Sequence, residues 1–175
     1  MSKMVADTSA LISLELSGCL SLVIESHTII APNAVESELI EISHHTNDEL
    51  ANCAKQILTH IKGKKIRVIS VADSKVQKII QRKVNRGEAE CFQLSIDEKT
   101  DLFLTDDLAA INQLSKISKE KNITTRISAA AIVALHQDQK ISKEKTKEYL
   151  LKMVKDRQWK STTMAYLIET FWKGN

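Results

Sequence analysis

The sequence contains few of the residues that break or cross-link a chain. Its 175 residues include four glycines, one proline and three cysteines. Such low glycine and proline content argues against long flexible linkers. The cysteines Cys19, Cys53 and Cys91 are odd in number and show no Cys-x-x-Cys spacing. This pattern argues against a disulfide framework or a zinc site and favours reduced thiols in a cytoplasmic protein.

Long apolar runs are also missing. No run approaches the roughly 20 residues that a helix needs to cross a bilayer, and residues 1–5 do not look like a signal peptide. We therefore expect a cytoplasmic protein without a membrane segment. The composition, 43% hydrophobic and 27% charged, is typical of a globular protein and argues against disorder. The length suits one domain with a small appendage.

Basic residues are scarce in the first third of the chain. Residues 1–61 contain two lysines and eight acids, a net charge of −6, whereas the whole chain carries +3. The remainder therefore carries +9. An acidic centre framed by basic helices would suit a phosphate polymer as ligand. Solvated helix faces with a chance imbalance explain the same distribution.

Short apolar strands alternate with helical patterns over the first three quarters of the chain. The expected strands are 3–6, 28–31, 66–71, 101–105 and 123–127. The expected helices are 10–24 with a break at Gly18, 32–42, 47–61, 75–84, 88–96 and 107–118. This alternation predicts an α/β fold, a three-layer α/β/α arrangement with a central parallel sheet. After residue 128 the pattern is helical, and we divide the chain into an α/β domain (1–138) and a helical C-terminal extension (139–175) packed on it.

Acidic residues stand where the expected strands end or helices begin. They are Asp7, Glu38, Glu88, Asp106 and Asp107. The carboxyl ends of parallel strands meet at one edge of a sheet, where open α/β folds bind ligands. Four carboxylates 5–6 Å apart would repel by roughly 3 kcal/mol per pair at an effective dielectric near 20, so they would require protons or cations. Oxygen ligands without histidine or cysteine favour Mg²⁺ or Mn²⁺, whose chemistry suits phosphodiester hydrolysis.

Each acid taken singly has a structural explanation, because acids at helix N-termini commonly serve as caps or dipole partners. Asp7 differs, since an aspartate that closes a buried strand needs partners to be tolerated. Thr8 or Ser9 is expected to cap the helix that follows it.

Four motifs, in this order, resemble those of PIN-domain (PilT N-terminal) nucleases. They are Val-Ala-Asp-Thr-Ser-Ala-Leu-Ile at 5–12, Pro-Asn-Ala-Val-Glu-Ser-Glu-Leu at 32–39, Gly-Glu-Ala-Glu-Cys-Phe-Gln-Leu at 87–94 and Leu-Thr-Asp-Asp at 104–107. The third is similar to the Gly-Glu-Ala-Glu helix start of one PIN branch. The resemblance implies the PIN fold and a metal-dependent endoribonuclease, often the toxin of a toxin–antitoxin pair.

The resemblance also implies roles for individual residues. Asp7, Glu38, Glu88 and Asp107 would be catalytic and would bind Mg²⁺ or Mn²⁺, with Asp106 as a neighbour that shares the metal-binding role. Ser9 and Thr105 match hydroxyl positions that orient these acids. The expected partners are an RNA substrate and an antitoxin protein.

Two further patterns concern surfaces. Basic residues precede the third motif at Lys75, Lys78, Arg82 and Arg86. They would either contact RNA phosphates or form a solvated helix face. Five of the seven aromatic residues lie in the C-terminal helices, at Tyr149, Trp159, Tyr166, Phe171 and Trp172. They would pack on their own domain or form an interface, and we expect a homodimer.

The leading hypothesis is an endoribonuclease that hydrolyses RNA phosphodiester bonds. The first alternative is a PIN-like RNA-binding or scaffold protein that does not cleave. The second is a phosphotransfer protein of receiver or haloacid-dehalogenase type, which also places acids at strand ends. Ser9 argues against a dehalogenase, because that chemistry needs a second aspartate two residues after Asp7.

Overall fold

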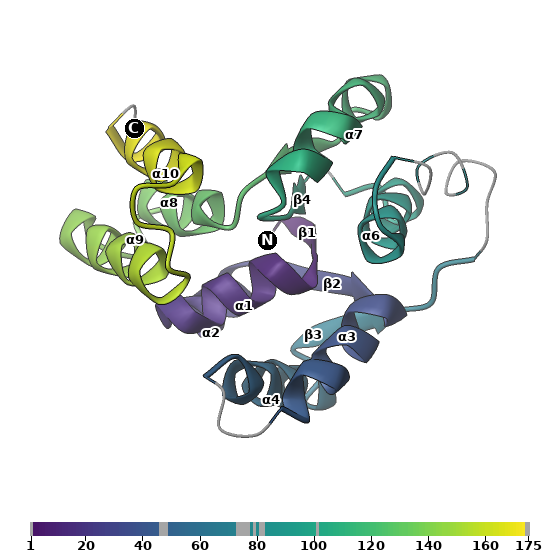
Figure 1. Cartoon of the computed structure of the whole chain (residues 1–175), viewed down its shortest axis with the longest axis horizontal. Coiled ribbons are helices and arrows are strands. Elements are labelled where there is room, and N and C mark those ends of the chain that lie inside the picture. Colours follow the sequence, from purple (N-terminus) through teal and green to yellow (C-terminus); the bar gives the residue numbers. More distant parts are fainter. Residues whose placement is uncertain are drawn as a thin grey trace.

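A parallel sheet forms the centre of the molecule (Figure 1). The computed structural model describes residues 2–45, 49–72, 78, 80, 83–100 and 102–173. Within them the strands are β1 (Lys3–Ala6), β2 (Thr28–Pro32), β3 (Ile66–Ile69), β4 (Leu102–Leu104) and β5 (Thr124–Arg126). Their order is β3-β2-β1-β4-β5, and every neighbouring pair is parallel.

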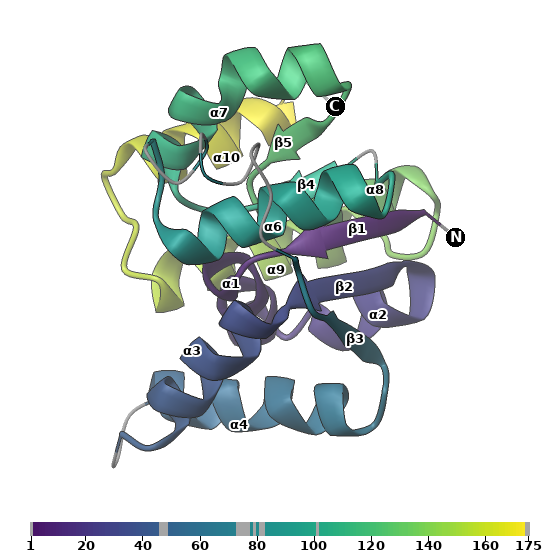
Figure 2. The ribbon, with the colours of Figure 1, turned by 90° about the vertical axis from the view of Figure 1, so that its right-hand side faces the viewer.

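Helices cover both faces of this sheet. Their bounds are α1 (Thr8–Ser17), α2 (Leu20–Ser26), α3 (Asn33–Ser43), α4 (Glu49–Lys62), α6 (Arg86–Asp97), α7 (Leu108–Lys121), α8 (Ala129–Gln137), α9 (Lys143–Asp156) and α10 (Thr163–Lys173). Figure 2 shows α6 in front of the sheet, where it packs against β1, β2 and β4. Helices α2, α8 and α9 lie behind the sheet. The predicted three-layer α/β/α fold is confirmed.

The direction in which strands are added reverses between β1 and β4. The chain starts in the middle of the sheet, adds β2 and β3 on one side, and then crosses back to add β4 and β5 on the other. Such a reversal opens a crevice at the carboxyl ends of the two central strands. Ala6 pairs with Leu104, and the Asp7 amide donates to the Leu104 carbonyl at 3.1 Å. Asp7 therefore stands at this crevice.

The central strands are apolar on both sides because helices cover both faces. Val5, Ala6 and Ile30 are completely buried. Between α6 and β4, the rings of Phe92 and Phe103 meet edge to face with centroids 6.4 Å apart. Burying one such side chain contributes about 1.5–3 kcal/mol, so this contact fixes α6 firmly on the sheet.

The C-terminal helices pack on the α/β part of the chain. Helix α9 runs antiparallel to α1, since Tyr149 lies beside Gly18 and the Lys152 ammonium donates to the Leu16 carbonyl. Met153 is buried, and its sulfur lies 3.5 Å from the Ser128 hydroxyl oxygen. The division of the chain at residue 138 remains a prediction.

Several local expectations were wrong. Asp7, not Thr8 or Ser9, caps α1, and Pro32 ends β2 instead of lying in the first turn of α3. Gly87 does not interrupt a helix, because α6 begins at Arg86 and includes it. Most of the helix expected at 75–84 lies outside the described residues.

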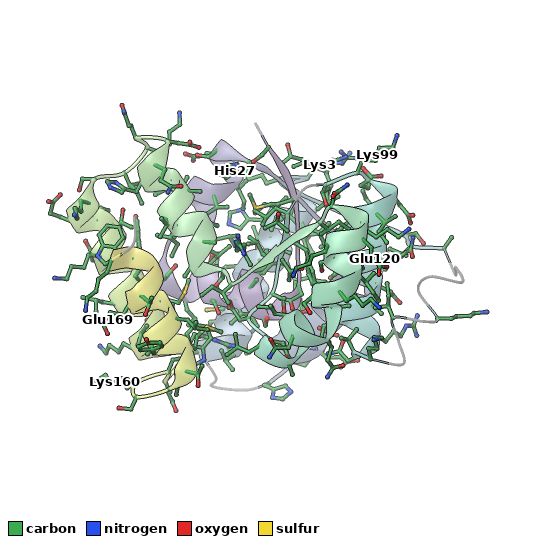
Figure 3. The ribbon with its side chains drawn as sticks, turned by 90° about the horizontal axis from the view of Figure 1, so that it is seen from above. Lys3, His27, Lys99, Glu120, Lys160 and Glu169 are labelled. Atoms are coloured by element: carbon green, nitrogen blue, oxygen red, sulfur yellow. The ribbon has the colours of Figure 1, made fainter. Side chains whose placement is uncertain are left out.

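Figure 3 labels three residues at the amino ends of strands. Lys3, His27 and Lys99 lie along one edge, where β1, β2 and β4 begin. The carboxyl ends of the strands are at the opposite edge. Among the described helices, none is by itself long and apolar enough to cross a membrane. Helices α1 and α2 meet that criterion only as a pair bent by 111°.

Candidate functional site

A cavity of about 340 Å³ lies at the carboxyl end of β1. Its lining comes from the starts of α1, α4 and α6, one face of α3, and the segments before α7 and after α9. The lining residues are Asp7, Thr8, Ser9, Ile12, Val35, Glu38, Ile42, Leu50, Asn85, Gly87, Glu88, Asp107 and Arg157. Four acids predicted from separate motifs thus line the same cavity.

Asp7 is held by the first turn of the helix that it caps. Its Oδ1 accepts hydrogen bonds from the Ala10 amide and the Ser9 hydroxyl, both at 2.8 Å. The Ser9 hydroxyl also accepts from the Asp106 amide at 3.0 Å, which links the ends of β1 and β4. Burial raises the pKa of Asp7 to about 6, although hydrogen bonds from Thr105, Ala10 and Ser9 act in the opposite direction.

Glu38 reaches the cavity from α3. Its Oε2 accepts a hydrogen bond from the Thr8 hydroxyl at 2.5 Å. Its Oε1 lies so close to Gly87 that a Cβ on that residue would stand 2.7 Å away. The glycine of the third motif therefore makes room for the carboxylate of the second.

Glu88 lies in the first turn of α6, where it forms a capping box with Asn85. The Glu88 amide donates to the Asn85 side chain at 2.9 Å, and Glu88 Oε2 accepts from the Asn85 amide at 3.2 Å. Burial and, to a smaller extent, the charge of Asp107 raise the pKa of Glu88 to about 7. A hydrogen bond with Asp107 also favours the protonated form. The Asp107 carboxyl group thus acts on Glu88 both through its charge and through a hydrogen bond.

The adjacent acids Asp106 and Asp107 have different surroundings. Asp107 is exposed, and its Oδ1 caps α7 by accepting from the Ala109 and Ala110 amides at 2.7 and 3.0 Å. Asp106 is buried, and its two oxygens accept from the amide and hydroxyl of Ser128, each at 2.8 Å. Asp107 lines the cavity, whereas Asp106 is not brought to it.

Thr105 connects Asp7, which follows β1, with Asp107, which precedes α7. Its hydroxyl accepts from the Asp107 amide at 3.1 Å and also hydrogen-bonds to Asp7. The same acids also affect the pKa of Cys91, which is buried in α6. Burial raises the pKa of its thiol, and the charges of Asp7 and Glu38 raise it further.

The chemistry of the donor set suits a hard cation, because the four acids offer only carboxylate oxygens. Each gives one oxygen to a donor of the protein itself. Among the described residues, no three histidine, cysteine, aspartate or glutamate side chains are arranged as a ready ligand set. The donors therefore fit such an ion in kind, and their side chains would have to turn to surround it.

The basic residues before the third motif are only partly described. Lys78 and Arg86 are exposed, and the Arg86 Nε forms an ion pair with Glu90 at 2.8 Å. Lys75 and Arg82 lie outside the described residues.

Sequence reasoning missed Asn85 and Arg157. The spacing of Asn85, three residues before Glu88, is the signature of a capping box and would have identified it. Arg157 belongs to no motif, and only the packing of α9 brings it to the cavity.

Comparison with known protein families agrees with the resemblance of the four sequence motifs. A family model described as "PIN domain" matches residues 3–170. Comparison with curated proteins and with solved structures gave no match. PIN domains are commonly nucleases and generally use divalent metal ions. The matched segment covers nearly the whole chain and contains all four acidic motifs, and the chain therefore belongs to the PIN-domain family.

Proposed function

We propose that this protein is an endoribonuclease that hydrolyses RNA phosphodiester bonds with Mg²⁺ or Mn²⁺. One observation carries the proposal: Asp7, Glu38, Glu88 and Asp107, from four separate segments, line one cavity at the reversal point of a parallel sheet. Membership of a family in which nucleases are common supports it. The proposal includes the PIN branch with the Gly-Glu-Ala-Glu motif.

In this proposal Asp7 and Asp107 hold the ion, and Glu38 and Glu88 complete its ligands or position the attacking water. A bound ion would lower the pKa of a water molecule and stabilise the phosphate oxygens. The water oxygen would form a bond to phosphorus while the bond from phosphorus to the leaving ribose oxygen breaks, and the proton that the water loses would be balanced by one that the ribose oxygen gains. Ser9 and Thr105 keep the Asp7 carboxylate oriented.

We propose a positioning role for Asp106 in place of the predicted metal-binding role. Both of its oxygens accept hydrogen bonds from Ser128. Its amide bonds to the Ser9 hydroxyl, which in turn bonds to Asp7. Asp106 thus acts on the cavity through its backbone amide and through its charge, which raises the pKa of Asp7, rather than as a ligand of the ion.

The test is cleavage of a defined single-stranded RNA labelled at one end. We expect products with Mg²⁺ or Mn²⁺, none with excess EDTA, and only background cleavage by Asp7→Asn. The matched control is Glu120→Gln, which removes an exposed acid at the opposite end of α7 from Asp107. Cleavage that persists in EDTA, or in the Asp7→Asn variant, would contradict the proposal.

The rival candidate is a PIN-like protein that binds RNA without cleaving it. It is favoured by the observation that, in the described part of the chain, no three acids form a ready ligand set. It predicts retardation of RNA on a native gel with no products at any metal concentration.

The proposed partners and location rest on the sequence. They are an RNA substrate, an antitoxin protein, a second copy of the chain and the cytoplasm. Exposed apolar side chains on α9 and α10, with Leu151 60% and Tyr166 67% exposed, support a protein contact there. Light scattering after size-exclusion chromatography would give the oligomeric state, and a small gene adjacent to this one would support the toxin role.

A further inference from the structure

Arg157 brings a positive charge to the acidic cavity. Arg157 caps the C-terminus of α9. Among the described residues that line the cavity, it is the one contributed by the C-terminal helices. The antiparallel packing of α9 on α1 explains its place. Tyr149 and Lys152 lie beside the end of α1, so the chain at Arg157 has travelled toward the start of that helix, where Ser9 and Ile12 also line the cavity.

The guanidinium of Arg157 contacts the Trp159 ring, but its Nε lacks a hydrogen-bond acceptor. Its Cζ lies 5.1 Å from the centroid of the Trp159 ring, a cation–π contact that restricts its motion. Its Nε is buried and has no hydrogen-bond acceptor. Within the described residues, no carboxylate oxygen lies within 4 Å of its nitrogens. A buried donor of this kind requires an explanation, because native structures nearly always satisfy such groups.

The cavity contains four acids, yet Arg157 pairs with none of them in the described structure. A counter-ion for the acids would be expected to form such a pair. A guanidinium instead matches ligands with two anionic oxygens, and its planar fork binds phosphate through two parallel hydrogen bonds. If the acids hold cations, a phosphate oxygen is the anionic group that the cavity would receive.

We propose that Arg157 binds a phosphate group of RNA at the acidic cavity, so that the C-terminal helices complete the active site. This inference rests on the proposed function and adds a substrate-binding residue to it. Positive charge directed at a reacting phosphate stabilises the charge that develops during displacement. Trp159 orients the guanidinium and leaves its nitrogens available.

The simplest rival is a purely structural role for Arg157. Burial raises the pKa of Asp106, and the charge of Arg157 is among the influences that lower it. In that case Arg157 would stabilise the fold through Asp106 and would have no effect on RNA.

The experiment uses Arg157→Met, which keeps an unbranched apolar stem beside Trp159 but removes the guanidinium and its charge. Arg157→Lys keeps the charge without the planar fork. The matched control is Lys155→Met. Lys155 is exposed in the last turn of the same helix, and this substitution also removes one positive charge. Cleavage is measured in the wild-type background. Binding of uncleaved RNA is measured without metal in the Asp7→Asn background at several salt concentrations.

We expect Arg157→Met to lower kcat/KM about 100-fold and to weaken RNA binding. The slope of log affinity against log salt should fall by about one, because one phosphate contact is lost. Arg157→Lys should be intermediate and Lys155→Met close to the parent. Unchanged cleavage and an unchanged salt slope in Arg157→Met, beside a wild type that cleaves, would overturn the inference and leave the proposed function intact. A wild type that never cleaves would contradict the proposed function, and the salt slope would still test Arg157.

Discussion

Asp7 combines two roles that usually belong to different residues. It caps α1 through Oδ1, and it lines the acidic cavity between the two central strands. The cap fixes the side chain, and burial makes its ionised form unfavourable, which raises its pKa to about 6. A carboxylate in this state gains most from a cation, because the cation compensates the charge that burial penalises.

The stability of the protein should therefore depend on pH through Asp7. Its pKa of about 6 in the folded state exceeds the ordinary 3.8, so the folded state binds the proton more tightly. The resulting stabilisation is complete below pH 4 and is lost as the pH rises through about 6. A difference of about two pKa units corresponds to about 3 kcal/mol.

The Asp7→Asn variant lacks this titration, and asparagine also caps helices. Between pH 4 and pH 7 in EDTA, its free energy of unfolding should rise relative to the wild type by up to about 3 kcal/mol. Urea unfolding of both proteins at each pH measures the difference. Glu88 titrates in both proteins, so most of its contribution cancels, and only the small part that comes from the charge of Asp7 remains. Parallel pH profiles would show that Asp7 does not titrate in this range.

Metal binding should be visible in stability as well as in activity. At pH 7, Mg²⁺ or Mn²⁺ at 100 times its dissociation constant should stabilise the wild type by about 2.7 kcal/mol, since a ligand that binds only the folded state shifts the equilibrium by mass action. The Asp7→Asn variant should show a much smaller shift, because one ligand is lost. A thermal melt of each protein with and without the ion measures this effect. Equal shifts would mean that the ion binds elsewhere.

Gly87 offers a test of the contact between two motifs. A methyl group at this position would stand 2.7 Å from Glu38 Oε1, which is the end of a flexible side chain. Gly87→Ala should therefore displace Glu38 and reduce cleavage. Its stability should change little, because alanine improves helix propensity by up to about 1 kcal/mol and offsets the displacement.

A double-mutant cycle separates this mechanism from general damage to the helix. In a Glu38→Ala background, the Gly87→Ala change should have no further effect on cleavage, since the displaced carboxylate is already absent. Additive losses of cleavage would indicate that Gly87 acts through another group.

At the scale of elements, the two adjacent acids between β4 and α7 have different partners and different roles. Asp107 caps α7 at the cavity, whereas Asp106 bonds to Ser128 at the start of α8. The sequence identified both acids but could not rank them, because the partner of Asp106 lies 22 residues later. Which of the two acids faces the cavity depends on a tertiary contact, and the local sequence pattern contains no information on that contact.

Ser128→Ala tests the structural task of Asp106. The variant removes one of the hydrogen bonds to the buried Asp106 carboxyl group, and a hydrogen bond to a charged group contributes about 1.5–3 kcal/mol. We expect a loss of stability in that range and nearly normal cleavage per folded molecule, measured by urea unfolding and by RNA cleavage. Ser115→Ala, at an exposed position where the hydroxyl bonds only to a backbone carbonyl, is the control. A large loss of cleavage without loss of stability would instead place Asp106 in the chemistry.

The elements themselves were largely predictable. Apolar strands such as residues 28–31 and the alternation with helices gave the three-layer fold, because strands buried on both faces read as short apolar runs. Helix starts were less predictable. The sequence pattern predicts a break at Gly87, because glycine has low helix propensity, but the capping box of Asn85 and Glu88 begins α6 before it.

At the scale of the whole molecule, the C-terminal helices belong to the same structure as the sheet. The family model extends to residue 170 and therefore includes α9 and most of α10. Helix α9 covers α1 and contacts α8, and α10 packs on α9. The position of Arg157 in the cavity depends on this packing, which the sequence alone could not reveal.

Residues 1–138 alone should therefore fail to fold cooperatively. Removing the remaining helices takes away four buried apolar side chains, Leu150, Met153, Met164 and Ile168. At about 1.5–3 kcal/mol each, their loss approaches the roughly 5–15 kcal/mol that stabilises a typical domain. We expect the shortened chain to bind a hydrophobic dye and to melt without a sharp transition, whereas the full chain melts sharply. A sharp melt of residues 1–138 would show that the α/β domain is stable by itself, and RNA cleavage by that fragment would then exclude an essential role for Arg157.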